Sequence, residues 1–195
     1  LPMNHLIMDL IKRYGTNFKV SFSISGSALE QFALHAPEVI ESFKELAKTG
    51  SVEFLAETYA HSLASLSDTD EFERQVQRHT ARMEELFGQK PVTLRNSSLI
   101  YSDQIGERVA AMGFESMLTD GAKHVLGWKS PNFVYTNVMN PRLKLLLKNS
   151  RLSDDLTLRF SDHSWHEWPL TADKYARWLK DSTQDSEIVN LFMNY

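Results

Sequence analysis

The sequence predicts an α/β fold with a largely parallel sheet. Short segments rich in β-branched and aromatic residues alternate along the chain with longer segments in which apolar residues recur every three or four positions. Strands that alternate with helices form parallel sheets, because each helix returns the chain to the starting edge of the sheet. Polar residues follow several of the predicted strands, which favours a closed barrel, although an open doubly wound sheet fits the same pattern.

The first half of the chain shows this alternation clearly. Apolar spacing and glycine stops define the helices, and alternation of apolar with polar residues defines the first strand. In order, the predicted elements are a helix at 3–14, a strand at 18–24, a helix at 26–50 interrupted near Pro37, a strand at 52–56 and a helix from 68 or 69 to 87.

The second half is less regular, and Pro131 and Pro141 interrupt it as helix and strand breakers. In order, the predicted elements are a strand at 92–94, a helix at 103–112, strands at 114–118 and 143–147, a short strand or helix end at 156–160, a helix at 171–178 and a last strand at 188–193.

Composition narrows the classes of function. With 195 residues, 42% of them hydrophobic, the chain can bury one sizeable core, and we expect a single domain over residues 1–195. A net charge of -4 argues against a nucleic-acid partner, and no apolar run approaches the roughly 18 residues that a membrane span needs. The absence of cysteine excludes disulfides and is typical of a reducing compartment, so we predict a cytoplasmic protein. The sequence predicts no cofactor and gives no indication of oligomeric state.

Both ends of the chain suggest a fragment. Leu1 is not an initiator methionine, and the last apolar run stops at Tyr195, where an α/β enzyme places site residues. We therefore expect a barrel domain that is truncated at both ends.

The loop after the strand at 52–56 offers groups that suit a sugar. Glu57 can accept hydrogen bonds from hydroxyl groups, and Tyr59 can stack on a sugar ring, with His61 two residues further on. The spacing fits equally well a solvated carboxylate and a histidine hydrogen-bonded within its loop.

Polar residues also follow the strand at 92–94. Arg95 could hold a carboxylate and Asn96 could bond a hydroxyl group. Ser98 would need a base within hydrogen-bond reach to act as a nucleophile, and the Gly-x-Ser-x-Gly turn of serine hydrolases is absent around it. A serine hydrolase is therefore not expected.

Two further segments carry candidate residues. Asp120 follows the strand at 114–118, and Trp128 lies in a loop containing Gly and Pro, where an indole can stack on sugar or simply fill a gap in the packing. His163 and His166 are three positions apart, so on a helix they would share a face and could bind zinc. The pattern is not His-Glu-x-x-His and the neighbouring tryptophans indicate an aromatic loop, so we predict no metal.

Several segments, in order along the chain, together resemble the α-amylase-type members of glycoside hydrolase family 57. The most informative is Leu94-Arg-Asn-Ser-Ser-Leu-Ile-Tyr101, which is similar to a family motif close to Arg-Asn-Thr-Glu-Leu-Ile-Tyr. The other matching segments lie at 22–25, 55–63, 118–135, 146–160 and 190–195. The resemblance implies an incomplete TIM-like (β/α)7 barrel, present here without its first strand, which carries a His-Gln-Pro motif in the family, and without its C-terminal part.

The resemblance also implies a retaining mechanism on α-glucans. In that mechanism a glutamate forms a glycosyl-enzyme and an aspartate acts as acid/base, with the two carboxyl groups about 5–5.5 Å apart. Ser98 occupies the position of the glutamate, and Asn194 occupies the position of the aspartate in a segment resembling Phe-Met-Asp-Tyr. Both catalytic carboxylates are therefore expected to be replaced, and hydrolysis to be lost or greatly reduced.

Three hypotheses follow. The leading one is an amylase-like protein that binds starch, glycogen or maltooligosaccharides. Alternatively, Glu57 or Asp120 substitutes for a missing carboxylate in an active α-glucan hydrolase or transferase. The third is a metal-dependent hydrolase or deacetylase that uses His163 and His166. For the leading hypothesis, the predicted substrate contacts are Glu57, Tyr59, His61, Arg95, Asn96, Asp120 and Trp128.

Overall fold

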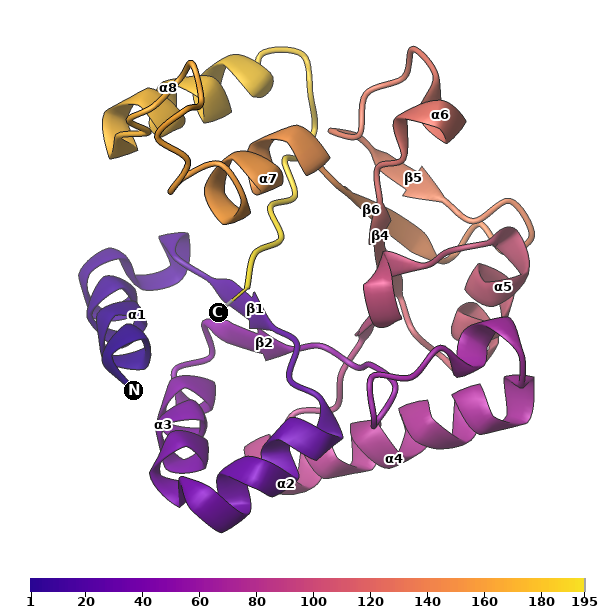
Figure 1. Cartoon of the computed structure of the whole chain (residues 1–195). Helices are drawn as coiled ribbons and strands as arrows, with labels where there is room; N and C mark the ends of the chain where they lie inside the picture. Colours follow the sequence, from indigo (N-terminus) through magenta and orange to yellow (C-terminus); the bar gives the residue numbers. More distant parts are fainter. Residues whose placement is uncertain (195) are drawn as a thin grey trace.

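A row of short parallel strands runs through the middle of the molecule (Figure 1). The computed structural model describes residues 1–194. In spatial order, the parallel strands are β1 (Val20–Phe22), β2 (Val52–Phe54), β3 (Thr93–Arg95), β4 (Ser116–Asp120) and β6 (Lys144–Lys148). Single parallel bridges join Ala56 to Leu94 and Lys148 to Asn190, which connects the two sheets and extends the row. Since all these pairings are parallel, the carboxyl ends of the strands lie on one side.

The helices lie around the outside of the strands in Figure 1. They are α1 (Pro2–Tyr14), α2 (Gly26–His35), α3 (Pro37–Lys48), α4 (Thr69–Phe87), α5 (Asp103–Ala111), the short α6 (Lys123–Leu126), α7 (Ser150–Thr157) and α8 (Ala172–Ser182). Short 3-10 turns occur at η1 (Gly15–Asn17), η2 (Ala64–Leu66) and η3 (Ser97–Leu99). Side-chain oxygens cap several of the helices by accepting a hydrogen bond from a first-turn N–H group, as Asp68 does for α4 and Asn149 for α7.

Among residues 1–194, no helix has both the length and the apolar character that a membrane crossing requires.

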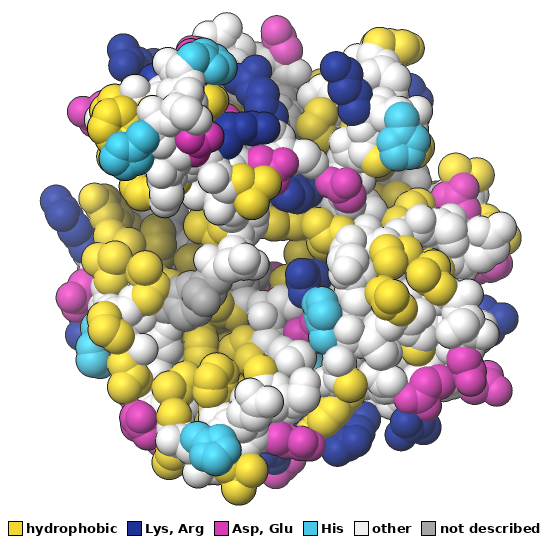
Figure 2. Space-filling model, in the orientation of Figure 1, with side chains coloured by type: hydrophobic (Ala, Val, Ile, Leu, Met, Phe, Trp, Pro, Cys, Tyr) yellow, Lys and Arg dark blue, Asp and Glu magenta, His cyan; other side chains and the backbone are white. Residues whose placement is uncertain are grey.

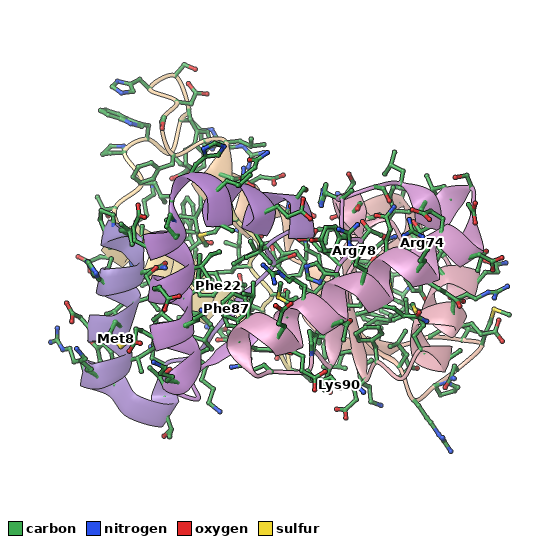
Figure 3. The ribbon with its side chains drawn as sticks, turned by 90° about the horizontal axis from the view of Figure 1, so that it is seen from below. Met8, Phe22, Arg74, Arg78, Phe87 and Lys90 are labelled. Atoms are coloured by element: carbon green, nitrogen blue, oxygen red, sulfur yellow. The ribbon has the colours of Figure 1, made fainter. Side chains whose placement is uncertain are left out.

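Two apolar cores hold the elements together. One lies between β3, β4, β6 and helices α4 and α5, and includes Leu94 and Met117, both fully buried. The other is aromatic: the ring of Phe54 in β2 stacks on Phe87 with centroids 4.0 Å apart, and Phe22 packs beside Phe54 at 6.1 Å. In Figure 3 the labelled Phe22 and Phe87 lie inside this second core, between α4 and the helices of the N-terminal part. Helix α4 contributes to both cores, so it joins the two parts of the molecule.

The predicted alternation of strands and helices is confirmed, with strands shorter than expected. The long helix at 26–50 is interrupted at Ala36, just before Pro37, as the proline predicted. The last predicted strand, 188–193, is reduced to the bridge at Asn190 within the described residues. Residues 156–160 contain the end of α7 and a turn, which excludes the strand alternative.

Strand β5 (Val134–Thr136) was not predicted. It pairs antiparallel with β6 at the edge of the sheet. Its residues are only partly buried or exposed, so the segment lacks the apolar run that marks the central strands.

Candidate functional site

A buried carboxylate lies at the carboxyl ends of the strands. Glu57 follows Ala56, the residue that bridges to β3, and its side chain is only 2% exposed. Its Oε2 atom lies 2.8 Å from His61 Nδ1 and 3.5 Å from a guanidinium nitrogen of Arg95. A buried carboxylate needs such partners, because an unpaired charge away from water is costly. We call Glu57, His61 and Arg95 the Glu57 cluster.

Two side chains of this cluster, those of His61 and Arg95, are open to a ligand. The His61 side chain is 43% exposed, and since its Nδ1 faces Glu57, its Nε2 is the nitrogen left for another partner. Arg95 is 30% exposed, so its guanidinium also reaches the surface. Glu57 therefore orients His61 and Arg95, which present a ring nitrogen and guanidinium N–H groups to the solvent side.

His79, on α4, hydrogen-bonds to the backbone of Glu57 and so supports the cluster. It was not among the residues predicted from the sequence. Its Nδ1 accepts a hydrogen bond from the Glu57 N–H group at 3.3 Å, and its Nε2–H donates to the carbonyl oxygen of Ile24 at 2.8 Å. A carbonyl can only accept, so His79 is neutral with its proton on Nε2. Burial lowers the pKa of His79, against the opposing effects of the Ile24 carbonyl and the Glu57 carboxylate. A signal for it existed, since His79 shares the buried face of α4 with Val76 and Met83.

We expect His79 to make stability dependent on pH. The folded-state pKa lies below the ordinary value of 6.5, so the unfolded chain binds a proton first as the pH falls. The contribution of His79 is therefore complete above pH 6.5 and is lost as the pH falls from 6.5 toward the lower folded-state pKa. Urea unfolding between pH 5 and pH 7.5 should show this loss in the wild type and a smaller one in His79→Gln. The exposed His35→Gln variant should retain the wild-type pH dependence, and an identical loss in His79→Gln would contradict the assignment.

The turn that carries Ser98 is held rigidly from inside. Asn96 is fully buried, and its amide donates to the hydroxyl of Ser65 at 2.9 Å and to the carbonyl of Ile100 at 3.0 Å. Its Oδ1 accepts from the N–H of Ser97, whose hydroxyl lies 2.9 Å from that of Thr58 in the loop after β2. These bonds tie the loops that follow β2 and β3 to each other.

Ser98 itself is exposed, with its backbone in the left-handed region at φ 53°. That conformation costs a non-glycine residue roughly 1–2 kcal/mol, so the buried bonds around Ser98 must hold it there. The Ser98 hydroxyl makes no hydrogen bond to any residue in 1–194. The turn therefore directs a free, neutral hydroxyl outward between two anchored neighbours.

Tyr59 and Asn96 lie beneath this surface rather than on it. The Tyr59 hydroxyl donates to Glu30 at 2.6 Å, and the Arg78 guanidinium lies 3.8 Å from the ring centroid. Burial, followed by the bond to Glu30, raises the pKa of Tyr59. Figure 3 shows Arg78 projecting from α4. With its hydroxyl and one ring face occupied, Tyr59 supports the loop instead of offering a surface for stacking.

The remaining predicted residues are exposed and make no hydrogen bond or ion pair with the Glu57 cluster among residues 1–194. Asp120 ends β4 and accepts a hydrogen bond from Ser150 at 2.8 Å. Trp128 is 92% exposed in the loop after α6. Asn194 is exposed in the extended segment after Asn190. The structure thus brings Glu57, His61 and Arg95 into contact, and no hydrogen bond or ion pair among residues 1–194 joins Asp120, Trp128 or Asn194 to them.

The histidine pair considered for zinc does not lie on a helix. The segment that contains His163 and His166 forms turns, and His163 stacks on Trp168 with ring centroids 4.4 Å apart. No group of three or more His, Asp or Glu side chains placed to hold a metal ion occurs among residues 1–194.

The face of the molecule seen in Figure 1 is hollowed at its centre. Figure 2 shows Lys or Arg, His and Asp or Glu side chains gathered at the rim of this hollow, among uncharged groups. A polar hollow among parallel strand ends is where barrel proteins bind their ligands.

The parallel strands, the outer helices and the polar strand ends define an incomplete TIM-like barrel with polar side chains at its strand ends. The sequence profile of glycosyl hydrolase family 57 matches residues 1–195. The chain belongs to glycosyl hydrolase family 57, as the motifs predicted.

Individual relatives agree with this membership. A protein of Methanocaldococcus jannaschii named "Putative alpha-amylase" is 44% identical over 196 residues, which span 100% of this chain and 41% of the relative. The crystal structure of 4-alpha-glucanotransferase from Thermococcus litoralis superimposes with a TM-score of 0.75 and 15% identity, over 96% of this chain and 28% of that one. The incomplete barrel fold is thereby confirmed, and the chain spans well under half the length of either protein.

The same fold extends beyond the glucan-active proteins. The crystal structure of a Mycobacterium smegmatis protein titled "putative polysaccharide deacetylase" matches with a TM-score of 0.64 and 19% identity, over 92% of this chain and 57% of that one. At that identity the similarity establishes the shared fold alone.

Proposed function

We propose that this chain forms the amylase-like part of a protein that binds α-glucans at the strand ends without hydrolysing them by the retaining mechanism. Family membership supports the class of ligand, as do the names of the M. jannaschii and T. litoralis proteins, which refer to α-amylase and α-glucan transfer. The observation that carries the proposal is the free Ser98 hydroxyl, at the position that the motif resemblance assigns to the family nucleophile.

The chemistry explains why activity should be lost. A neutral hydroxyl at Ser98 is shorter than a glutamate and cannot attack the anomeric carbon as a carboxylate does. Asn194 has no acidic proton to give to the leaving oxygen. General acid catalysis alone contributes typically about 10²–10⁴-fold, so loss of both groups leaves little conventional turnover.

The Glu57 cluster supplies the proposed recognition. His61 Nε2 and the Arg95 guanidinium would bond sugar hydroxyls, while the buried Glu57 carboxylate positions them. Trp128 and Asp120 are proposed as outer contacts, by stacking and by hydrogen bonding respectively. Tyr59 and Asn96 would act indirectly, since their polar atoms already have internal partners.

The burial of Glu57 speaks against its use as a replacement nucleophile. A nucleophile must reach the anomeric carbon, and the Glu57 side chain is 2% exposed with Oε2 beside His61 and Arg95. We therefore do not propose Glu57 as a substitute nucleophile. The following experiment would reveal it if Glu57 did play that role.

Calorimetry with maltoheptaose and an assay for reducing sugar test the proposal on the full-length protein. We expect binding without sugar release, and we expect His61→Ala to weaken binding about three- to tenfold, the range of one hydrogen bond. Glu57→Gln should also weaken maltoheptaose binding, because a neutral amide orients His61 and Arg95 less firmly than the carboxylate does. The exposed His35→Ala variant is the matched control. Absence of binding at millimolar maltoheptaose, or rapid sugar release that Glu57→Gln abolishes, would contradict the proposal.

A further inference from the structure

A second pocket lies between α7, the turns that follow it, and α8. Its volume is about 540 Å³, within the roughly 300–1,000 Å³ range of small-molecule sites. Its lining residues are Arg151, Asp155, Arg159, Trp165, His166, Glu167 and Trp178. None of them belongs to the Glu57 cluster, and all lie between positions 151 and 178.

Two indoles form an apolar corner in this pocket. The rings of Trp165 and Trp178 have centroids 6.0 Å apart and planes inclined by 75°. Both side chains are half-buried, so each packs against the protein while part of the ring remains accessible. Lys174 lies 5.3 Å from the centroid of Trp178 and fixes that indole further. Apolar ring faces at a fixed angle suit the C–H faces of a pyranose ring.

The polar groups of the pocket include both donors and acceptors, and ion pairs hold several of them. Asp155 is 6% exposed on its side chain and is held by Arg159 at 2.6 Å. Glu167 is held by Lys174 at 2.6 Å, with His166 at 3.6 Å. Arg151 is exposed and has no hydrogen bond or ion pair with residues 1–194, so its guanidinium is a free donor at the pocket edge.

The charges of the lining indicate a neutral ligand. Two arginines and two carboxylates balance among the lining residues, and the adjacent Lys174 is paired with Glu167, so little charge is left to attract a phosphate or a polycation. Fixed donors, fixed acceptors and aromatic faces without net charge are what a polyhydroxylated, uncharged molecule requires.

We propose that the α7–α8 pocket is a second carbohydrate-binding site, which holds an α-glucan segment away from the Glu57 cluster. The choice of α-glucan rests on the proposed function. The pocket holds one sugar ring against the Trp165–Trp178 corner, with Arg151 and the Glu167 carboxylate bonding its hydroxyl groups, while the buried Asp155 holds Arg159 in place. The strand-end site is then occupied either by another part of the same glucan or by a second glucan molecule.

Titration of the full-length protein with maltotriose, followed by calorimetry and by tryptophan fluorescence, tests this site. The pocket variants are Trp178→Ala and Arg151→Ala; since Arg151 has no partner among the described residues, its loss cannot disturb folding through a broken contact. His61→Ala removes the strand-end contact, and Trp168→Phe changes a tryptophan that lies outside the pocket lining.

We expect two binding events in the wild type. Each pocket variant should weaken binding at the α7–α8 pocket about tenfold and leave binding at the strand ends unchanged. His61→Ala should weaken binding at the strand ends and leave binding at the pocket unchanged. Trp168→Phe should bind as the wild type does. If His61→Ala removes all binding while both pocket variants bind like the wild type, the second site is overturned and the proposed function stands. If only the pocket variants lose binding, the second site is supported and the strand-end proposal fails. No binding of maltotriose to the wild type would overturn the second site, while the maltoheptaose titration described above decides on the proposed function.

Discussion

Replacing Ser98 with glutamate and Asn194 with aspartate in the full-length protein is expected to produce hydrolysis of maltooligosaccharides. The double substitution places a carboxylate nucleophile and a proton donor at the two positions that the motif resemblance assigns to the catalytic groups. Each group contributes separately to the barrier, and the acid alone typically accounts for about 10²–10⁴-fold in rate. We therefore expect release of reducing sugar from maltoheptaose at a rate at least about 100-fold above that of the wild type.

The structure suggests that Ser98 will accept the change. Its side chain is exposed and free, and its left-handed backbone is already held by the buried bonds of Asn96 and Ser97. The matched control is Ser98→Gln with Asn194→Asp, which has nearly the same shape and no nucleophile. Each single substitution should give far less than the pair. If the double variant folds, binds maltoheptaose and still releases no sugar, the assignment of Ser98 and Asn194 to the positions of the catalytic carboxylates is contradicted.

The fold could be predicted from the sequence because the strands and helices carry strong local signals. The α4 helix combines a side-chain cap at Asp68, a buried stripe and a left-handed stop at Gly88, and its predicted bounds match the structure closely. The break before Pro37 follows from the steric restriction that a proline places on the preceding residue. Strand β5 lacked such a signal. Its residues have no apolar run of their own, and it is a strand because it pairs with β6.

The candidate site was predictable only in part. Sequence order placed Glu57 and Arg95 at strand ends, and parallel pairing through Ala56 and Leu94 then brought them within 3.5 Å. Burial could not be predicted in the same way: Tyr59 and Asn96 look like surface ligands in the sequence, yet their partners Glu30 and Ser65 lie about 30 residues away along the chain. The α7–α8 pocket was missed for the same reason, because its two tryptophans come together only through the packing of α8 against the turns after α7.

Removing the ring of Phe54 is expected to cause the largest loss of stability. Phe54 is fully buried, stacks on Phe87 at 4.0 Å and contacts Phe43 edge-on at 6.1 Å. A Phe54→Ala substitution leaves a cavity among these rings, and such changes cost about 3–5 kcal/mol. Since whole domains are stable by only about 5–15 kcal/mol, urea unfolding of the full-length protein should show a much lower midpoint.

The consequence for the site follows from the position of Phe54 in the chain. It lies in β2, three residues before Glu57, so a loosened β2 also loosens the parallel bridge from Ala56 to Leu94 that aligns Glu57 with Arg95. Phe54→Ala should therefore weaken maltoheptaose binding even under conditions where the variant remains folded. Leu34→Ala is the control, because Leu34 is 78% exposed on α2 and its loss should change stability by no more than about 0.5 kcal/mol. Equal effects of the two substitutions would show that the aromatic core does not position the strand ends.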